Sequence, residues 1–266
     1  MSDLLLERRE GPVTVLTLND PDRANPLSSE LVAKLRAAFE VSATDPRVRA
    51  VVLTGAGRNF SAGADLAALE AIGSGGGDET NRKDAENLCK LFEALGDHPK
   101  LTIAAVHGAA VAGGCGLATA CDLVVAEEGA RFAYTEVKIG FLAAMVLTFL
   151  TRRVAGHVAR RLLLDPEFID GRRAVSIGLA DELAEDGKAV ASAIDLARSV
   201  CAKASPSALA ATKSLLNETV GLGWREALAV AAEANVRQRA EPECRRGVRS
   251  FLESKTTPDW LVDAED

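Results

Sequence analysis

Apolar residues recur along this chain with two different periods. Some stretches are short continuous apolar runs, which are typical of strands buried on both faces, and others repeat every three or four residues, which is typical of amphipathic helices. The predicted elements are strands at 4–8 and 13–18, a helix at about 29–43, a strand at 50–53, helices at about 64–72 and 79–95, strands at 101–106 and 122–126, and a helix from about residue 113 between these last two. Strand and helix units of this size indicate a layered α/β core rather than a doubly wound sheet.

Helices dominate the chain after residue 143. The last strand is expected at Gly178-Leu179-Ala180, and predicted helices follow at about 187–204, 206–220, 223–238 and 241–252. These helices are long and amphipathic, which suits packing on the core or on another subunit. We therefore expect a core at residues 1–204 and a C-terminal helical region at residues 205–266.

Composition narrows the class of protein. The 266 residues are 48% hydrophobic and 26% charged, and the formal net charge of -7 gives no overall positive field for nucleic acid or an anionic membrane. The five cysteines form no Cys-x-x-Cys pair, so we expect reduced thiols in the cytoplasm and neither a metal site nor a disulfide framework. Residues 1–10 carry no signal-peptide pattern, and the longest apolar run, residues 141–150, is too short to span a membrane.

Two segments rich in small residues lie near the points where a predicted strand gives way to a helix. They are residues 55–66, GAGRNFSAGADL, and residues 107–117, HGAAVAGGCGL. A loop without side-chain bulk lets an anionic oxygen approach the unpaired N–H groups at a helix N-terminus. Two such loops facing one point would form an oxyanion hole. Glycines that only permit tight turns are nevertheless the commoner explanation of each segment taken alone.

Several other chemistries lack their usual signatures. Neither segment is a dinucleotide-binding or triphosphate-binding glycine loop. Ser61 does not lie in a nucleophile elbow, because Asn59 stands where that motif needs its first glycine. His107 adjoins the second segment and could line a site, although a core or surface role is more common for a lone histidine.

An ordered series of motifs covers nearly the whole chain. It begins with residues 60–66 (FSAGADL), 103–108 (IAAVHG) and 112–117 (AGGCGL), and it continues through residues 121–126, 132–140, 171–174, 178–180 and 251–253. This series resembles the crotonase superfamily, the enoyl-CoA hydratase/isomerase family. The resemblance implies a spiral of β-β-α units followed by a C-terminal helical trimerisation region, often assembled as a dimer of trimers. It also implies a coenzyme A thioester as the substrate and no separate cofactor.

The resemblance implies catalytic roles for three residues. The thioester carbonyl oxygen is expected between the backbone N–H groups of Ala64 and Gly113. Glu136 matches the family's second catalytic glutamate, which exchanges a proton with the α-carbon. Nearby apolar side chains could raise the pKa of Glu136 toward a value suited to acid/base chemistry; they are those of Phe132, Tyr134, Ile139 and Phe141. Outside the family, a single glutamate in this setting is usually exposed.

The resemblance also implies contacts with coenzyme A. Ala62, Asp65 and Leu66 fall where the family's backbone meets the adenine. Arg58 falls where members often carry a basic residue near the phosphates, although a solvated surface arginine is equally common.

Gly116 departs from the family's two-glutamate pattern, in which the first catalytic glutamate occupies this place. One carboxylate then activates water while the other handles the α-proton. A single carboxylate is compatible with a 3-enoyl to 2-enoyl-CoA isomerase, whereas residues 136–146 look more like bacterial enoyl-CoA or methylglutaconyl-CoA hydratases. We expect hydration of 2-enoyl-CoA to 3-hydroxyacyl-CoA first, isomerisation second and acyl-CoA binding without turnover third. If Gly116 faces the β-carbon of the substrate, Gly116→Glu should raise hydration relative to isomerisation, without a stability cost from helix propensity.

Overall fold

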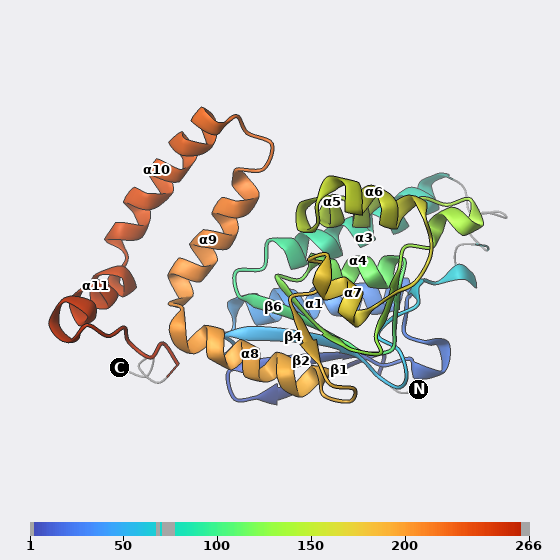
Figure 1. Cartoon of the computed structure of the whole chain (residues 1–266), viewed down its shortest axis with the longest axis horizontal. Helices are drawn as coiled ribbons and strands as arrows, with labels where there is room; N and C mark the ends of the chain where they lie inside the picture. Colours follow the sequence, from blue (N-terminus) through green and yellow to red (C-terminus); the bar gives the residue numbers. More distant parts are fainter. Residues whose placement is uncertain (1–2, 68–69, 71–77, 262–266) are drawn as a thin grey trace.

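A six-stranded sheet forms the centre of the protein, whose computed structural model describes residues 3–67, 70 and 78–261 (Figure 1). The sheet has the order β1-β2-β4-β6-β8-β11. β1 and β2, the first two predicted strands, form an antiparallel hairpin, and each later pair of neighbours is parallel. The strands are β1 (Leu5–Glu10), β2 (Val13–Leu18), β4 (Ala50–Gly55), β6 (Leu101–Val106), β8 (Leu123–Glu127) and β11 (Glu182–Ala184).

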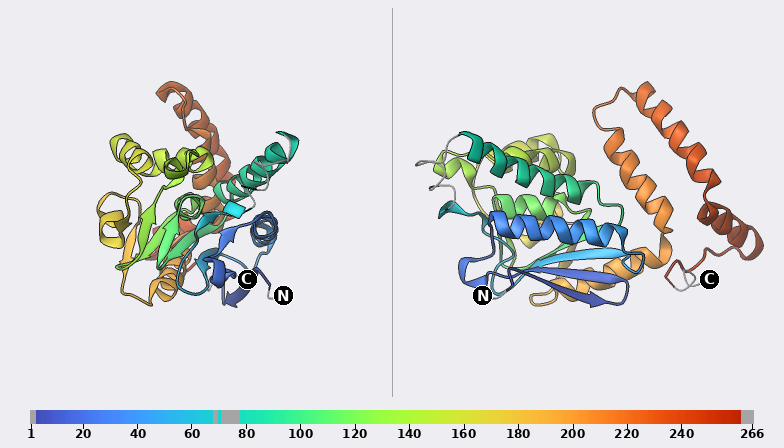
Figure 2. Two further views of the ribbon diagram at one scale, coloured as in Figure 1. Left: turned by 90° about the vertical axis from the view of Figure 1, so that its right-hand side faces the viewer. Right: turned by 180° about the vertical axis from the view of Figure 1, so that it is seen from behind.

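Helices cover both faces of this sheet. β4 and β6 are buried along their whole length, as expected for parallel strands with helices on each side. Val52 and Ile103 pack with Ala193 of α8 (Ala189–Lys203) on one face, while Leu53 and Val106 belong to the core on the other face. That second core also includes side chains of α1 (Ser29–Thr44) and α4 (Gly113–Ala120). Figure 2 shows the helices around the sheet in two further views.

Each of the two glycine-rich segments forms a short strand that pairs with a neighbouring part of the chain. β3 (Pro26–Leu27) pairs with β5 (Gly63–Ala64), and β9 (Arg131–Ala133) lies between β7 (Ala109–Val111) and β10 (Ile169–Asp170). Outside them, α3 (Asp78–Gly96) packs on α1, and α5 (Ala144–Arg153) packs on α4. The remaining core elements are η1 (Pro21–Arg23), η2 (Glu136–Ile139), α6 (Gly156–Leu164) and α7 (Gly171–Ser176).

The last three helices form an arm beside the core. They are α9 (Pro206–Glu218), α10 (Trp224–Ala240) and α11 (Pro242–Ser254), and α10 lies farther from the sheet than α9 (Figure 1). Lys213 ties α9 to the core, because its Nζ donates to Lys100 O at 2.7 Å and to Asp122 Oδ2 at 2.6 Å. The arm begins close to residue 205, and its role in oligomerisation stays a prediction.

Most of the elements expected from the sequence are present, with two corrections. The strand expected at Gly178-Leu179-Ala180 is wrong: these residues form a turn after α7, Gly178 has φ +76, and the strand follows at Glu182–Ala184. The strand expected at 122–126 begins one residue later, at Leu123. Part of the helix expected at about 64–72, and the whole glycine run at 73–77, lie outside the described residues. None of the helices in the described part of the chain has both the length and the apolar character needed to cross a membrane.

Candidate active site

The two glycine-rich segments lie side by side, joined by backbone hydrogen bonds. Phe60 N donates to His107 O at 3.1 Å, and Ser61 N donates to Ala109 O at 3.1 Å. Val111 N in turn donates to Ser61 O at 2.9 Å. The segments therefore form a short parallel ladder, which fixes the residues that follow on each side.

This ladder brings Ala64 and Gly113 together. Gly63 has φ +83, and a Cβ atom there would lie 2.6 Å from Val111 O and 2.9 Å from Gly113 N, so only glycine fits. A Cβ atom on Gly113 would lie 3.7 Å from Ala64 N. Gly113 is the first residue of α4, and an N–H group at that position has no partner within its own helix.

The backbone just before α4 is strained. Ala112 has φ 49 and ψ -122, a conformation that residues with a Cβ atom rarely adopt. A hydrogen bond from Ala112 N to Ala133 O, 2.8 Å long, holds it there. Strain of this kind is typical of functional sites, where surrounding contacts over-determine the backbone. The same hydrogen bond joins the start of α4 to β9, three residues before Glu136.

Glu136 places a carboxyl group in a setting poor in polar partners. It is the first residue of η2 and only 8% exposed, and its Oε2 has no hydrogen-bond partner among the residues that the structure describes. Burial raises the pKa of Glu136, as expected from the sequence. Phe132 and Tyr134 are buried nearby in the chain, whereas Ile139 is 60% exposed and Phe141 is exposed as well. The apolar setting therefore arises from the body of the protein more than from η2.

The thiol of Cys115, in the first turn of α4, is unreactive at neutral pH. Burial, with a smaller contribution from the charge of Glu136, raises the pKa of Cys115 to about 12. A thiol with so high a pKa carries almost no nucleophilic thiolate at neutral pH. Glu136, whose pKa burial raises, is thus the titratable group of this region that is suited to proton transfer.

Gly116 is buried in α4 against α5. A Cβ atom there would overlap Val146 Cγ1 and lie 2.6 Å from Val146 Cβ, and Phe92 closes the space further out at 3.5 Å. A glutamate at Gly116 would therefore cost stability through overpacking rather than through helix propensity, because even one methyl group displaces α5. Whether this residue contacts substrate stays a prediction.

The residues expected to meet coenzyme A lie along the outer side of the first segment. Ala62 is exposed, and its N donates to Ala24 O at 2.8 Å. Leu66 is 59% exposed, and Arg58 is exposed too. The Asp65 carboxylate differs, since it accepts a 2.7 Å hydrogen bond from Arg23. Their contacts with a ligand stay a prediction.

Three observations bear on residues that sequence reasoning treated lightly or missed. His107 Nε2 lies 3.2 Å from Gly57 O, which fits a turn-holding role. Val146 was not singled out by any motif, although it fills the space beside Gly116. Asn25 was also missed. Its position in the loop Asp20-Pro21-Asp22-Arg23-Ala24-Asn25-Pro26 gave one signal, since asparagine tolerates left-handed backbone in turns.

The fold and the site define a class of enzyme. Two backbone nitrogens from neighbouring loops, at a helix N-terminus and near a buried carboxyl group, suit the stabilisation of an enolate and the transfer of its proton. Comparison with known proteins agrees with this class. The chain belongs to the enoyl-CoA hydratase/isomerase family, and the sequence pattern of this family matches residues 8–261.

Individual relatives sharpen the family assignment. A Thermus thermophilus protein named as a candidate enoyl-CoA hydratase is 46% identical over 94% of this chain and 98% of its own length. The 2,3-dehydroadipyl-CoA hydratase of Escherichia coli is 33% identical over 98% and 99% of the two chains. The crystal structure of a Mycobacterium smegmatis enoyl-CoA hydratase covers 97% of this chain and 99% of its own, with a TM-score of 0.89 and 32% identity. Family and relatives support an enoyl-CoA hydratase as the main interpretation.

Proposed function

We propose that this protein adds water to a 2-enoyl-CoA thioester and releases a 3-hydroxyacyl-CoA. The observation that carries the proposal is the placement of Ala64 N beside Gly113 at the start of α4, together with the buried carboxyl group of Glu136, whose charge acts on Cys115 of the same helix and whose Oε2 has no hydrogen-bond partner among the described residues. The names of the relatives support the same reaction. A role in fatty acid metabolism and a cytoplasmic location follow as part of the proposal, and unpaired cysteines such as Cys115 and Cys201 suit a reducing compartment.

In the proposed reaction the thioester oxygen accepts hydrogen bonds from Ala64 N–H and Gly113 N–H. Negative charge develops on this oxygen as a water molecule attacks the β-carbon, and each fixed donor of this kind stabilises the transition state by roughly 3–4 kcal/mol. The Glu136 carboxylate takes a proton from the attacking water. The same carboxyl group then returns a proton to the α-carbon, so Glu136 is ionised again and the hydroxyl group remains on the β-carbon.

The contact between Gly116 and Val146 supports this use of one carboxylate. It also supports a second candidate reaction, the isomerisation of 3-enoyl-CoA to 2-enoyl-CoA. There Glu136 would take a proton from the α-carbon and deliver it to the γ-carbon, and no activated water would be needed. The two reactions share the enolate and the carboxyl group, and they differ in whether water has access to the β-carbon.

The coenzyme A part of the substrate is proposed to lie along residues 62–66, with Arg58 near its phosphates. Ala62 is exposed, so its backbone could contact the edge of an adenine ring. The side chain of Leu66 is exposed too, and it offers an apolar surface to the same ring. The Arg58 side chain is free to turn toward a phosphate, because it is solvent-exposed. No separate cofactor enters the proposed reaction.

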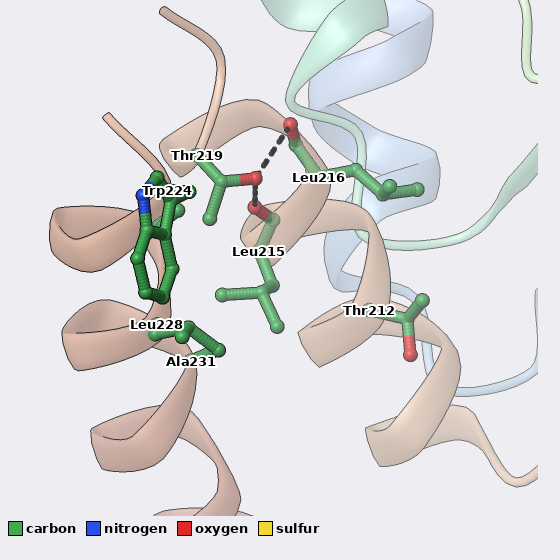
Figure 3. Close-up of a pocket in the computed structure, with 8 residues that line it drawn as sticks. Thr212, Leu215, Leu216, Thr219, Trp224, Leu228 and Ala231 are labelled. Atoms are coloured by element: carbon green, nitrogen blue, oxygen red, sulfur yellow. Dashed lines mark hydrogen bonds between the residues drawn. The ribbon is translucent and has the colours of Figure 1, made fainter. Parts of the chain in front are cut away.

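The protein is further proposed to assemble as a homotrimer or a dimer of trimers through its C-terminal arm. A groove of about 550 Å³ lies between α9 and α10, lined by Leu215, Leu216, Trp224 and Leu228 among others (Figure 3). Three of these side chains are largely exposed: Leu216 at 64%, Trp224 at 66% and Leu228 at 58%. Contiguous apolar surface of this kind is typical of protein interfaces. A second copy of the chain is the proposed occupant.

The proposed function is tested by assaying 2-enoyl and 3-enoyl thioesters beside a titration with a saturated acyl-CoA. Glu136→Gln should lower turnover of the active thioester by roughly 10²–10⁴-fold and leave the affinity for the saturated ligand unchanged, because the amide keeps the shape but transfers no proton. Glu185→Gln, at an exposed glutamate, is the matched control and should be as active as the wild type.

Each outcome separates the candidates. Hydration that depends on Glu136 supports the main proposal, and turnover of the 3-enoyl thioester alone supports the isomerase. Saturable binding with neither activity would mean that the protein only binds acyl-CoA. A Glu136→Gln protein with activity within a few-fold of the wild type would remove Glu136 from its proposed role.

A further inference from the structure

A fully buried asparagine lies beside the first glycine-rich segment and takes part in none of the steps above. Asn25 is 0% exposed and has φ +54. Ala24 before it has φ +60, so two consecutive residues with a Cβ atom adopt left-handed backbone. Such backbone persists only where surrounding contacts hold it. Backbone hydrogen bonds hold part of it, from Asn25 N to Asp20 O at 2.8 Å and from Ala24 N to Pro21 O at 3.1 Å, and the Asn25 side chain supplies further contacts.

Every polar atom of that side chain is used. Asn25 Nδ2 lies 3.0 Å from Ala56 O, 2.9 Å from Asn59 O and 3.2 Å from Phe60 O, so its two hydrogens are shared among three carbonyl groups. Asn25 Oδ1 accepts a 2.9 Å hydrogen bond from Asp20 N. The side chain thus joins the turn at 56–60 to the loop at 20–25, with no water needed between them.

The backbone on both sides of this junction leads directly into the site. Ser61 Oγ donates to Asn25 O at 2.8 Å. Beyond that bond the two segments pair as β3 and β5, where Leu27 lies opposite Ala64. A Cβ atom on Gly113 would contact Leu27 Cδ1 at 3.4 Å, so the same short ladder also touches the start of α4.

We propose that Asn25 is a positioning residue for the Ala64 N–H group. It holds the turn at 56–60, and through Ser61 and the two-residue ladder it sets where Ala64 N lies relative to Gly113 N. β3 and β5 are only two residues long, so the turn that Asn25 holds acts together with the ladder between residues 60–61 and 107–111 in fixing this position. The inference rests on the proposed function, since it assumes that Ala64 N–H binds the thioester oxygen.

The test uses the full-length protein and the variant Asn25→Asp. This change keeps the shape of the side chain and its tolerance of left-handed backbone, but it replaces two donors by an acceptor that faces three carbonyl oxygens. Asn19→Asp is the matched control: it removes an amide donor from the same loop, where Asn19 Nδ2 binds Asp3 O rather than the 56–60 turn. Circular dichroism and urea unfolding establish that each variant is folded. Asn25→Gly, which keeps the backbone conformation, replaces Asn25→Asp if the latter does not fold.

Two measurements are made on each folded variant. The first is the infrared carbonyl stretch of a bound saturated acyl-CoA labelled with carbon-13 at the thioester carbonyl, which falls in frequency when oxyanion donors polarise the bond. The second is steady-state kinetics. For Asn25→Asp we expect the carbonyl frequency to return most of the way to its value in solution, and kcat to fall about 10–100-fold while KM changes less than about threefold. Asn19→Asp should match the wild type in both.

The outcomes distinguish this inference from the proposed function. If the wild-type protein binds the labelled ligand without any change in carbonyl frequency, the oxyanion hole itself is wrong. If the wild type polarises the carbonyl and a folded Asn25 variant polarises it equally, the positioning role is overturned while the proposed function stands. Loss of the fold in both Asn25 variants would also overturn it, because Asn25 would then serve stability alone.

Discussion

Val146 occupies the space into which a side chain on Gly116 would have to extend. A Cβ atom at Gly116 would overlap Val146 Cγ1, and Val146 is only 4% exposed. The place expected for a first catalytic glutamate is therefore filled from α5 by an apolar side chain. This relationship explains why the chain carries glycine there, and it leaves Glu136 as the carboxylate on which the proposed chemistry depends.

Gly116→Ala should destabilise the protein by about 1–3 kcal/mol, because the added methyl group overpacks the contact with Val146. The direction of this change in stability is informative, since alanine inside a helix normally stabilises it by about 1 kcal/mol relative to glycine. Gly156→Ala is the matched control: nothing lies within 4 Å of the added Cβ atom there. Combining Gly116→Ala with Val146→Ala should cost less than the sum of the two changes. Additive urea-unfolding energies, or a more stable Gly116→Ala protein, would contradict the overlap.

Glu136→Gln should make the protein more stable at neutral pH while it lowers turnover. The raised pKa of Glu136 means that the folded state binds this proton more tightly than the unfolded state does. Its favourable contribution is therefore present at low pH and is lost as pH rises through the folded-state pKa. The glutamine variant does not lose stability in this way, because its amide does not ionise. Its stability advantage over the wild type at pH 7 should therefore shrink as the pH is lowered toward 4. Urea unfolding across that range measures the difference, and an advantage that grew toward acid pH would contradict burial of an unpaired carboxylate.

Parts of the fold and site that depend on local sequence could be predicted from the sequence. Gly63 and Gly113 mark close backbone approach, and small residues around them are a local signal of loops that meet. The error at Gly178-Leu179-Ala180 has a local cause as well, since two apolar residues after a glycine suit a turn as well as a strand. Val146 and Asn25 are different. Their roles depend on Gly116 and on the turn at 56–60, about 30 residues away in each case, and nothing in their own neighbourhood encodes that partner.

His98 should make the protein sensitive to mild acid. It is 2% exposed, its Nε2 lies 3.0 Å from Ser42 Oγ, and its Nδ1 lies 3.1 Å from Lys100 O and 3.2 Å from Lys100 N. Burial lowers its pKa to about 4, against an ordinary value of about 6.5. The unfolded state therefore binds the proton first, and stability is lost as pH falls from 6.5 toward 4, by roughly 3 kcal/mol from this group.

The check on His98 is urea unfolding at several pH values. His98→Gln should be less stable than the wild type at pH 7 but should lose less stability between pH 6.5 and 4. His157→Gln, which alters an exposed histidine, serves as the control and should follow the wild type across this range. A His98→Gln profile parallel to that of the wild type would show that another group governs the acid response.

The apolar groove between α9 and α10 predicts an oligomer that charged substitutions in the groove should dissociate. Trp224 and Leu228 project from α10 toward α9, and together with Leu216 they leave apolar surface open in a single chain (Figure 3). Burying a large apolar side chain contributes about 1.5–3 kcal/mol, and the contribution is repeated at every interface of a symmetric oligomer. Sedimentation of the wild type should therefore give three or six times the 27.9 kDa of one chain.

Trp224→Glu combined with Leu228→Glu should shift that mass to 27.9 kDa, because each interface would then bury unpaired carboxylates. Val41→Glu is the matched control. Val41 is 62% exposed on α1, close to the 58% of Leu228, but it lies on the core rather than on the arm, so its substitution should leave the oligomer intact. Circular dichroism establishes that the variants keep their helices. A wild-type protein that sediments as a single chain, or a charged groove variant that keeps the full mass, would show that this groove is not a subunit interface.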